Sequence, residues 1–272
     1  MPISPCRNQG VLHYRFASWA HLDQIAHGFF TRTGGVSPAP FQSLNVSLSV
    51  GDDRRNVTKN RGIVSGCMKS NKLVWIDQVH GSRTVVYSNR PPFHLPPAEG
   101  FEDTADAMVT DIPGMMLTLQ VADCQPVFLV DPVRNVVGAV HSGWRGSTAN
   151  IAGRTVRIMT EAFECRPEGM LAGIGPSLGP CCAEFVNYRS EIPKAFWKYR
   201  TGNHFDFWAL TRDQLCGAGL VSKNIFSSGL CTRCGVDSFF SYRAQKTTGR
   251  LAAVIGVKKT RSDPVGPECL NF

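Results

Sequence analysis

Two histidines and one cysteine stand where predicted strands end. His80 closes the segment WIDQVHG, Cys124 lies in VADCQP, and His141 lies in GAVHSGW. Neutral imidazole and thiolate are ligands that zinc and copper prefer. Three such ligands leave a fourth tetrahedral position for water, as in catalytic zinc sites. Their separations along the chain match no zinc-finger spacing, so only the fold can assemble this site.

The same three residues are compatible with other interpretations. The histidines fit hydrogen-bonded core positions, and the cysteine fits a buried thiol. Alternatively, Cys124 is a nucleophile and His80 or His141 is its base, because an adjacent histidine favours the thiolate. Metal ligation and nucleophilic catalysis both need Cys and His in contact, so the residue types leave the choice open.

Two arginines lie next to glycines in predicted loops after strands. Arg32 lies in TRTGG, and Arg145 lies in SGWRG. A guanidinium beside free backbone N–H groups suits a phosphate or a carboxylate, although either residue also fits an ordinary surface turn. Trp144, beside Arg145, fits either a wall for a planar ring or a core position.

The chain has ten cysteines but no predicted signal peptide, which indicates reduced thiols in a cytoplasmic protein. Cys231 and Cys234 form the only CxxC, and a structural zinc site needs a second pair. The adjacent Cys181 and Cys182 are a poor second pair, because neighbouring thiols rarely chelate one metal together. The sequence therefore predicts that these four are buried or loop thiols.

The composition is that of a globular protein, with 43% hydrophobic and 18% charged residues in 272. No apolar run approaches the roughly 18 residues that span a bilayer. The net charge is +8, but the basic residues are scattered. We therefore expect no membrane association, no nucleic-acid partner, and a cytoplasmic location.

The pattern of apolar residues and glycine or proline breaks predicts an α/β (α+β) protein with mixed sheets and helices outside. Predicted strands lie in 26–53, 72–81, 82–88, 115–122, 126–130, 135–141, 170–185 and the C-terminal part. Predicted helices are 53–68, capped by Asp52 or Asp53; 147–164, capped by Ser147 or Thr148; 189–199; and 209–220. The proline-rich segment 89–103 is a predicted lid or rim loop.

Several motifs together resemble the YfiH-like, or laccase-domain, family. In chain order they are FTRTGGVS, SLNVS, WIDQVHG, ADAMVT, VADCQPV, AVHSGWRG, GIGPSLGPCC and FFSYRAQKTTGRLAA, which cover residues 30 to 253. The resemblance implies a single layered domain over residues 1–272, related to cysteine-dependent deamidase toxin domains. It implies one zinc ion on His80, Cys124 and His141, with Cys124 and His141 also part of the catalytic machinery.

The resemblance also implies the activity. Family members are described as purine nucleoside enzymes: they phosphorolyse adenosine, inosine, guanosine and methylthioadenosine, and they deaminate adenosine. The family was first named for a copper-dependent polyphenol oxidase activity, and one member is linked to peptidoglycan-precursor editing; both are alternatives here. The expected ligands are purine nucleosides and phosphate, and the expected state is a monomer or homodimer.

Given that chemistry, six further residues become candidates. Asp123, beside Cys124, either shuttles protons or orients a ligand histidine. The candidates for substrate binding are Arg32 and Arg145 for phosphate, Asn45 for the ribose or base, and Tyr242 and Arg243 for closing the pocket. The chain departs from the family at Ala183, where members often carry an aromatic residue, so ligand preference is in question there.

Overall fold

Two six-stranded β-sheets form the centre of the protein. The computed structural model describes residues 2–8, 10–70, 72–93 and 103–259. Sheet 1 has the order β1 (Ile3–Asn8), β2 (Val11–Phe16), β3 (Ile25–Phe30), β16 (Leu251–Val257), β9 (Met116–Val121), β4 (Leu73–Val74). Sheet 2 has the order β15 (Ile225–Ser227), β12 (Leu171–Ile174), β10 (Gln125–Asp131), β11 (Val136–Ser142), β8 (Ala107–Thr110), β6 (Thr84–Tyr87).

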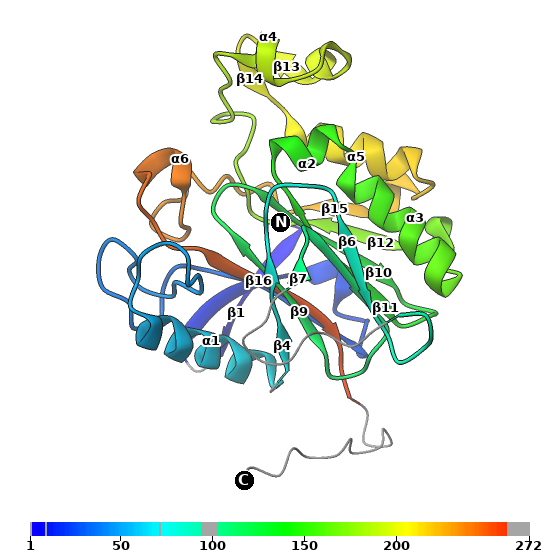
Figure 1. The fold of residues 1–272 in the computed structure, drawn as a ribbon, viewed down its shortest axis with the longest axis horizontal. Helices are drawn as coiled ribbons and strands as arrows, with labels where there is room; N and C mark the ends of the chain where they lie inside the picture. Colours follow the sequence, from blue (N-terminus) through cyan, green and yellow to red (C-terminus); the bar gives the residue numbers. More distant parts are fainter. Residues whose placement is uncertain (1, 9, 71, 94–102, 260–272) are drawn as a thin grey trace.

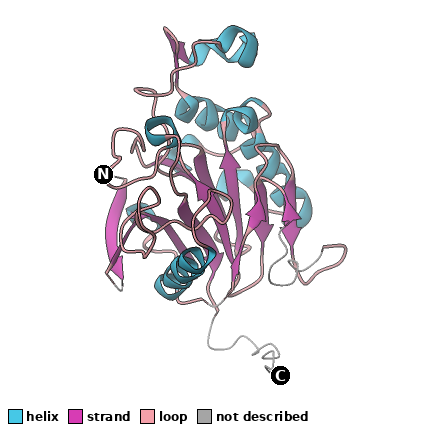
Figure 2. Ribbon diagram, turned by 60° about the vertical axis from the view of Figure 1, so that its left-hand side comes forward, coloured by secondary structure: helices cyan, strands magenta, loops and turns pink. Residues whose placement is uncertain are grey.

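The two sheets pack against each other through their inner faces (Figures 1 and 2). Their strands are mixed in direction: β10 and β11 are antiparallel, whereas β12 and β15, and also β6 and β8, are parallel. Phe29 of β3 stacks on Phe128 of β10 with ring centroids 4.6 Å apart. The apolar runs at 115–122, 126–130 and 135–141 are confirmed as β9, β10 and β11, and the predicted α/β class is confirmed.

Helices cover the outer faces of both sheets. The α-helices are α1 (Arg54–Met68), α2 (Trp144–Thr148), α3 (Ile151–Phe163), α4 (Tyr188–Glu191), α5 (Phe207–Gly217) and α6 (Tyr242–Gln245). The 3-10 helices are Ala17–Trp19, Pro167–Gly169, Lys194–Tyr199 and Ser222–Asn224. α1 packs on sheet 1, and α3 and α5 pack on sheet 2 (Figure 1).

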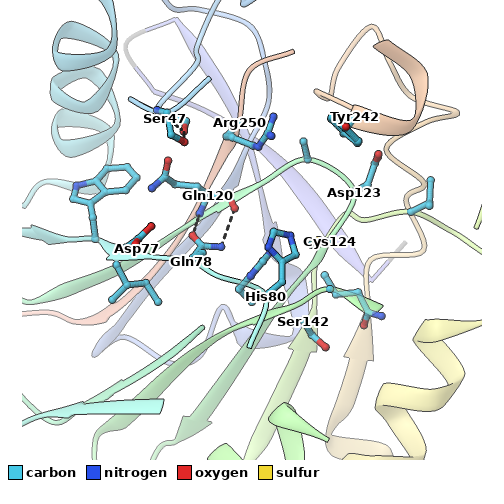
Figure 3. Close-up of a pocket in the computed structure, with 18 of the residues that line it drawn as sticks. Ser47, Asp77, Gln78, His80, Gln120, Asp123, Cys124, Ser142, Tyr242 and Arg250 are labelled. Atoms are coloured by element: carbon cyan, nitrogen blue, oxygen red, sulfur yellow. Dashed lines mark hydrogen bonds between the residues drawn. The ribbon is translucent and has the colours of Figure 1, made fainter. Parts of the chain in front are cut away.

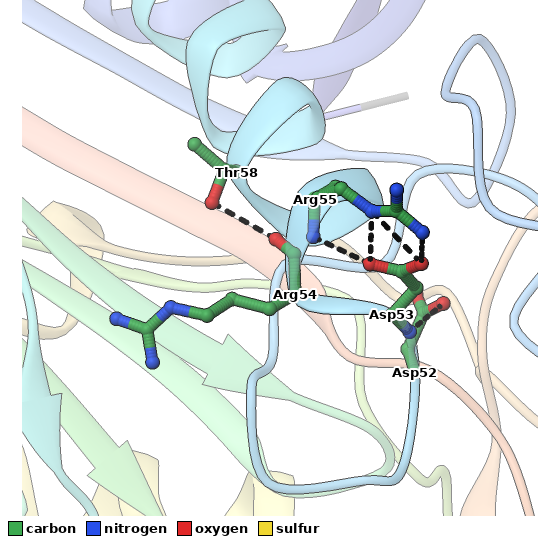
Figure 4. A network of polar contacts seen from close by, with 5 residues as sticks. All are labelled: Asp52, Asp53, Arg54, Arg55 and Thr58. Carbon is green, nitrogen blue, oxygen red and sulfur yellow. Dashed lines mark hydrogen bonds and ion pairs between the residues drawn. The ribbon is translucent and has the colours of Figure 1, made fainter.

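The start of α1 is as predicted from the sequence. The Asp53 side chain accepts a hydrogen bond from Arg55 N at 2.8 Å and caps the helix (Figure 4). The Arg55 guanidinium also pairs with the same carboxylate at 2.8 Å. α1 therefore begins directly after the loop that carries Ser47 and Leu48, two residues that line the pocket described below.

Two helix predictions were wrong in their boundaries. The predicted helix 147–164 is two helices, α2 capped by Gly143 and α3 capped by Asn150. Asn150 has a left-handed backbone, and its side chain accepts from Gly153 N, so it ends one helix and starts the next. The predicted helix 189–199 is interrupted at Pro193, which has no N–H to donate, and becomes α4 and a 3-10 helix.

A small projection built on residues 183–207 stands above sheet 2 (Figure 1). It contains α4 and the short hairpin of β13 (Arg200–Thr201) and β14 (His204–Phe205). Its aromatic cluster includes Tyr188 and Phe205 and packs against Phe185 and Trp144. A second short pair joins β5 (Ile76–Asp77) and β7 (Asp103–Thr104). Most of the predicted lid, residues 94–102, lies outside the described residues.

None of the helices that the structure describes has both the length and the apolar character needed to cross a bilayer.

Candidate metal centre and pocket

Cys124 and His141 lie together because two neighbouring strands of sheet 2 place them at one end. β10 begins at Gln125, which pairs with Ser142, and Pro126 pairs with His141. Cys124 therefore lies immediately before β10, at the end of the sheet where β11 finishes. Gly143 follows β11 at this point, and a Cβ there would lie 3.0 Å from Cys124 Sγ and 3.1 Å from His80 Cδ2. The glycine thus leaves room for both side chains.

His80 comes from the segment after β5, and a buried carboxylate holds it in position. His80 has a left-handed backbone with φ 60°. Asp106, whose side chain is fully buried, accepts hydrogen bonds from His80 N at 2.9 Å and from Gly81 N at 2.6 Å. The same carboxylate lies 2.8 Å from His141 Nδ1. One side chain therefore fixes both histidines, and it leaves Nε2 of His141 for the pocket.

The three predicted ligand residues meet at one point. Ligand atoms of His80, Cys124 and His141 all lie within 4.8 Å of one another, and the two imidazole centroids are 4.9 Å apart. His80 is exposed, Cys124 is half-buried and His141 is buried. Two imidazoles and a thiol that converge on a space open to solvent suit a metal with a free coordination position.

Electrostatics favour an ionised thiol in the protein without metal. Burial alone would raise the pKa of Cys124, but His141 and a hydrogen bond from His80 lower that pKa to about 6. Burial opposes the charged form of His141, yet Cys124 and Asp106 raise the pKa of His141 to about 9. Burial would also raise the pKa of Asp106, but His141 and the two backbone N–H groups hold it below its usual range.

We therefore expect metal-free protein to react with iodoacetamide at Cys124 with a midpoint near pH 6. A free cysteine has a pKa of about 8.5. Because the pKa is lowered, the thiolate predominates above the midpoint, and reactivity falls as the pH drops through it. The rate is measured by mass spectrometry of the peptide that contains Cys124. A midpoint above about pH 8 would contradict this electrostatic account, and added zinc should protect the thiol.

The three candidate metal ligands lie in a large cavity of about 1790 Å³ (Figure 3). Figure 3 shows His80 beside Cys124, with Arg250, Asp123 and Tyr242 around the same space. The cationic side chains that line it are Arg54, Arg61, Lys72, Arg145, Arg243, Lys246 and Arg250. The carboxylates that line it are Asp77, Asp123, Glu184 and Glu191. The excess of cations favours an anionic ligand.

Two hydrogen bonds join Gln78 and Gln120, which both line this cavity. The Gln78 side chain accepts from Gln120 N at 2.8 Å and donates to Gln120 O at 3.0 Å (Figure 3). These two bonds fasten the segment that leads to His80 onto β9 of sheet 1. The cavity therefore sits where the ends of both sheets meet.

Three predicted substrate residues line this cavity, and two lie elsewhere. Arg145, Tyr242 and Arg243 are lining residues. Arg32 instead donates to the carbonyls of Gln42 and Val236, each at 2.9 Å. Its assignment to phosphate is not supported, because its guanidinium holds loops together outside the cavity.

Asn45 is fully buried, and its side chain is used entirely within the protein. Its oxygen accepts from Ser47 N at 3.1 Å and Arg250 N at 2.9 Å. Its amide donates to Ser47 O and to Asp52. Asn45 therefore positions two residues of the cavity wall, Ser47 and Arg250, rather than meeting a ligand itself.

Asp123 lies beside Cys124 with a left-handed backbone, φ 87°. Its carboxylate accepts from Thr232 Oγ1 and from Arg243 N, both at 2.6 Å. The carboxylate that is hydrogen-bonded to His141 belongs to Asp106, whereas that of Asp123 is bonded to Thr232 and Arg243, so the idea that Asp123 orients a histidine is wrong. The geometry favours Asp123 as the residue that anchors both the loop at Thr232 and the first turn of α6.

Sequence reasoning missed two residues of the site, Asp106 and Arg250. Both lie inside motifs that carry the family resemblance, ADAMVT and FFSYRAQKTTGRLAA. The available signal for Asp106 was a carboxylate at the start of an apolar strand, where burial demands partners. Arg250 lines the cavity close enough to Cys124 and Asp123 for their charges to act on its pKa, which burial lowers.

The structure also shows where Trp144 and Ala183 lie relative to the cavity. Trp144 lines the cavity and packs edge-on against Phe185 at 6.3 Å, with the Arg145 guanidinium 4.4 Å above its ring. Ala183 is buried in the aromatic cluster of the projection and is not among the described residues that line the cavity. The neighbouring Glu184 and Phe185 line it instead.

The CxxC and the adjacent cysteines lie in loops, as predicted, but the structure brings the two pairs together, which the sequence did not indicate. The sulfur atoms of Cys181, Cys182, Cys231 and Cys234 all lie within 4.8 Å of one another. The adjacent cysteines face the CxxC across two loops, which sequence spacing alone does not reveal.

Fold and site together define a two-sheet α/β protein with a candidate His–Cys–His metal centre in a cationic cavity. Residues 26–258 match the family model described as "Multi-copper polyphenol oxidoreductase laccase". The chain belongs to this laccase-domain family, whose members include proteins named YfiH and YlmD.

Relatives with assigned names support an enzyme. "Purine nucleoside phosphorylase YlmD" of Geobacillus stearothermophilus is 34% identical over an alignment of 250 residues, and the match covers 84% of this chain and 89% of the relative. "Purine nucleoside phosphorylase YfiH" of Escherichia coli is 33% identical over an alignment of 247 residues, and the match covers 87% of this chain and 96% of the relative. The crystal structure of Bacillus licheniformis YfiH superposes with a TM-score of 0.82 at 30% identity, covering 94% of this chain and 99% of that one.

Proposed function

We propose that the protein is a zinc-dependent purine nucleoside enzyme that phosphorolyses adenosine, inosine, guanosine and methylthioadenosine and also deaminates adenosine. The observation that carries this proposal is the His–Cys–His group on the wall of a cavity rich in cations. The names of the relatives support the substrate class. The thiol of Cys124 and the other free cysteines suit a reducing, cytoplasmic setting.

The donor set fits zinc. His80, Cys124 and His141 would hold the ion, and Asp106 would keep both histidines oriented. When bound in such a site, zinc lowers the pKa of a coordinated water to about 7 and so supplies a nucleophile at neutral pH. Two histidines and a cysteine are also a ligand set that copper accepts, which makes the polyphenol oxidase activity the second candidate.

The cavity walls suit the two substrates of phosphorolysis. Its volume exceeds the roughly 300–1,000 Å³ of ordinary small-molecule pockets, so it has room for a nucleoside and a phosphate together. Trp144, Phe185 and Tyr242 offer aromatic surfaces for a purine. Arg145 and Arg250 offer guanidinium groups for the phosphate, which they would hold against the ribose as the base leaves.

Product analysis tests the proposal. Zinc-loaded protein is incubated with adenosine, with and without phosphate, and the products are separated by chromatography. Phosphorolysis gives adenine and ribose-1-phosphate only when phosphate is present, whereas deamination gives inosine without it. Unchanged adenosine after a long incubation, both with and without phosphate, would overturn the proposal. Oxygen uptake with a phenol that requires copper and is absent with zinc would favour the oxidase instead.

Arg250→Ala is expected to raise the KM for phosphate by about 10- to 100-fold, the effect of losing a hydrogen bond between charged groups. The guanidinium lies in the cavity wall, where its Nη1 also donates to the carbonyls of Thr248 at 3.0 Å and Gly249 at 3.1 Å, and Asn45 holds the backbone of Arg250. Steady-state kinetics at varied phosphate measure the change. Arg157→Ala, at an exposed position on α3, is the matched control and should leave the KM unchanged. Equal KM values in the two variants would remove Arg250 from the phosphate site.

A further inference from the structure

A second group of metal-ligating side chains lies apart from the His–Cys–His centre. Cys181 and Cys182 belong to the loop after β12, and Cys231 and Cys234 belong to the loop after β15. The Sγ atom of Cys234 is 3.6 Å from that of Cys181 and 3.5 Å from that of Cys182. All four are free thiols.

The topology explains why these loops meet. β12 and β15 are parallel neighbours in sheet 2, so both loops leave the same edge of the sheet. The pairing continues beyond the strands: Ser177 N donates to Leu230 O at 3.1 Å, and Thr232 N donates to Ser177 O at 3.0 Å. The two cysteine pairs are thus held opposite each other by backbone hydrogen bonds.

We propose that Cys181, Cys182, Cys231 and Cys234 form a structural zinc site. Four thiolates around zinc, each at about 2.3 Å, stand about 3.8 Å apart at the corners of a tetrahedron. The observed separations of 3.5 and 3.6 Å, and the overall limit of 4.8 Å, bracket that spacing. Since all four corners are filled by protein, the site has no open position for water and serves structure rather than turnover.

The surroundings of Cys231 suit a thiolate ligand. Gly179 N donates to Cys231 Sγ at 3.3 Å, the kind of outer hydrogen bond that orients a metal ligand. A Cβ on Gly179 would lie 3.1 Å from Cys231 Cβ and 2.9 Å from Trp208 Cη2. Glycine therefore lets the loop approach the sulfur closely enough to form this bond.

A metal here would stabilise one wall of the cavity. Glu184 and Phe185 line the cavity and follow Cys182 almost directly in the chain. Thr232, between the two cysteines of the CxxC, donates to Asp123, the residue next to Cys124. The zinc site would hold both segments in place without contacting the substrate.

Metal counting tests the proposal separately from the proposed function. We expect about two zinc ions per chain in full-length protein, and about one in His80→Ala and in the Cys181→Ser/Cys234→Ser double variant. Both replaced cysteines are exposed, and Cys216→Ser, at an exposed cysteine on α5, is the matched control that should keep two. Zinc is measured by mass spectrometry with inductively coupled plasma after gel filtration.

Cobalt gives a second readout that does not depend on activity. Cobalt-loaded His80→Ala protein should show the intense sulfur-to-cobalt absorption of a tetrathiolate site, and the serine changes made in that background should remove it. If the double variant fails to fold, titrating wild-type protein with a mercurial should still release two zinc ions. The proposal is overturned if wild-type protein holds no more zinc than the His80→Ala variant loses. Disulfides between the two loops in freshly isolated protein, with no zinc bound there, would overturn it equally.

Discussion

His80→Ala protein is expected to lose the cavity metal and at least about 100-fold in nucleoside turnover. Loss of an outer hydrogen-bond partner alone costs up to about 100-fold in such sites, so loss of a ligand should cost no less. His80 is exposed, and the polar contacts of its segment with Asp106 are made by backbone N–H groups that alanine keeps. Zinc content and turnover of adenosine with phosphate measure the effect.

The left-handed backbone of His80 calls for a second variant. A residue with a Cβ at positive φ is strained, and asparagine tolerates that conformation better than alanine. His80→Asn should therefore fold as wild type and still lose zinc and activity. His21→Ala, at an exposed histidine before β3, should keep both. Full activity in either His80 variant would show that this residue is not a ligand.

The sequence predicts the fold well where strands are apolar and long. β9, β10 and β11 were found because their buried residues form continuous runs between polar breaks. The sequence does not predict the helix boundaries within 147–164 and 189–199, because the hydrophobic periodicity continues across Asn150 and Pro193. A left-handed cap and a missing N–H donor interrupt those helices without changing their hydrophobic periodicity.

The candidate site is only partly predictable, for a related reason. Strand-end position gave His80, Cys124 and His141, whose convergence the structure shows. The roles of Asn45 and Arg32 could not be predicted from their residue types. Both side chains could bind a ligand, but in the fold they make hydrogen bonds within the protein. The cysteine cluster was missed because its two pairs meet only through the parallel pairing of β12 and β15.

Asp106→Asn is expected to weaken zinc binding by about 10- to 100-fold, the cost of losing an outer partner of metal ligands. The carboxylate accepts from three donors: the backbone N–H groups of His80 and Gly81, and Nδ1 of His141. An amide at this fully buried position must place its NH₂ group against one or two of these donors. The unsatisfied contact should also lower the free energy of unfolding by about 1–3 kcal/mol.

Three measurements separate the two effects. Competition with a chelator gives the zinc affinity, urea denaturation gives the stability, and assays at excess zinc show whether turnover returns when the site is refilled. Asp131→Asn is the matched control, because Asp131 is also buried and accepts from the backbone N–H groups of Val133 and Arg134, far along sheet 2 from the metal ligands. We expect it to change stability while zinc affinity stays the same. Wild-type zinc affinity in Asp106→Asn would mean that the ligand histidines need no carboxylate to orient them. Asp106 also holds the left-handed turn at His80. If zinc binding is weakened and turnover stays low even at excess zinc, the main effect of Asp106 is to place that turn.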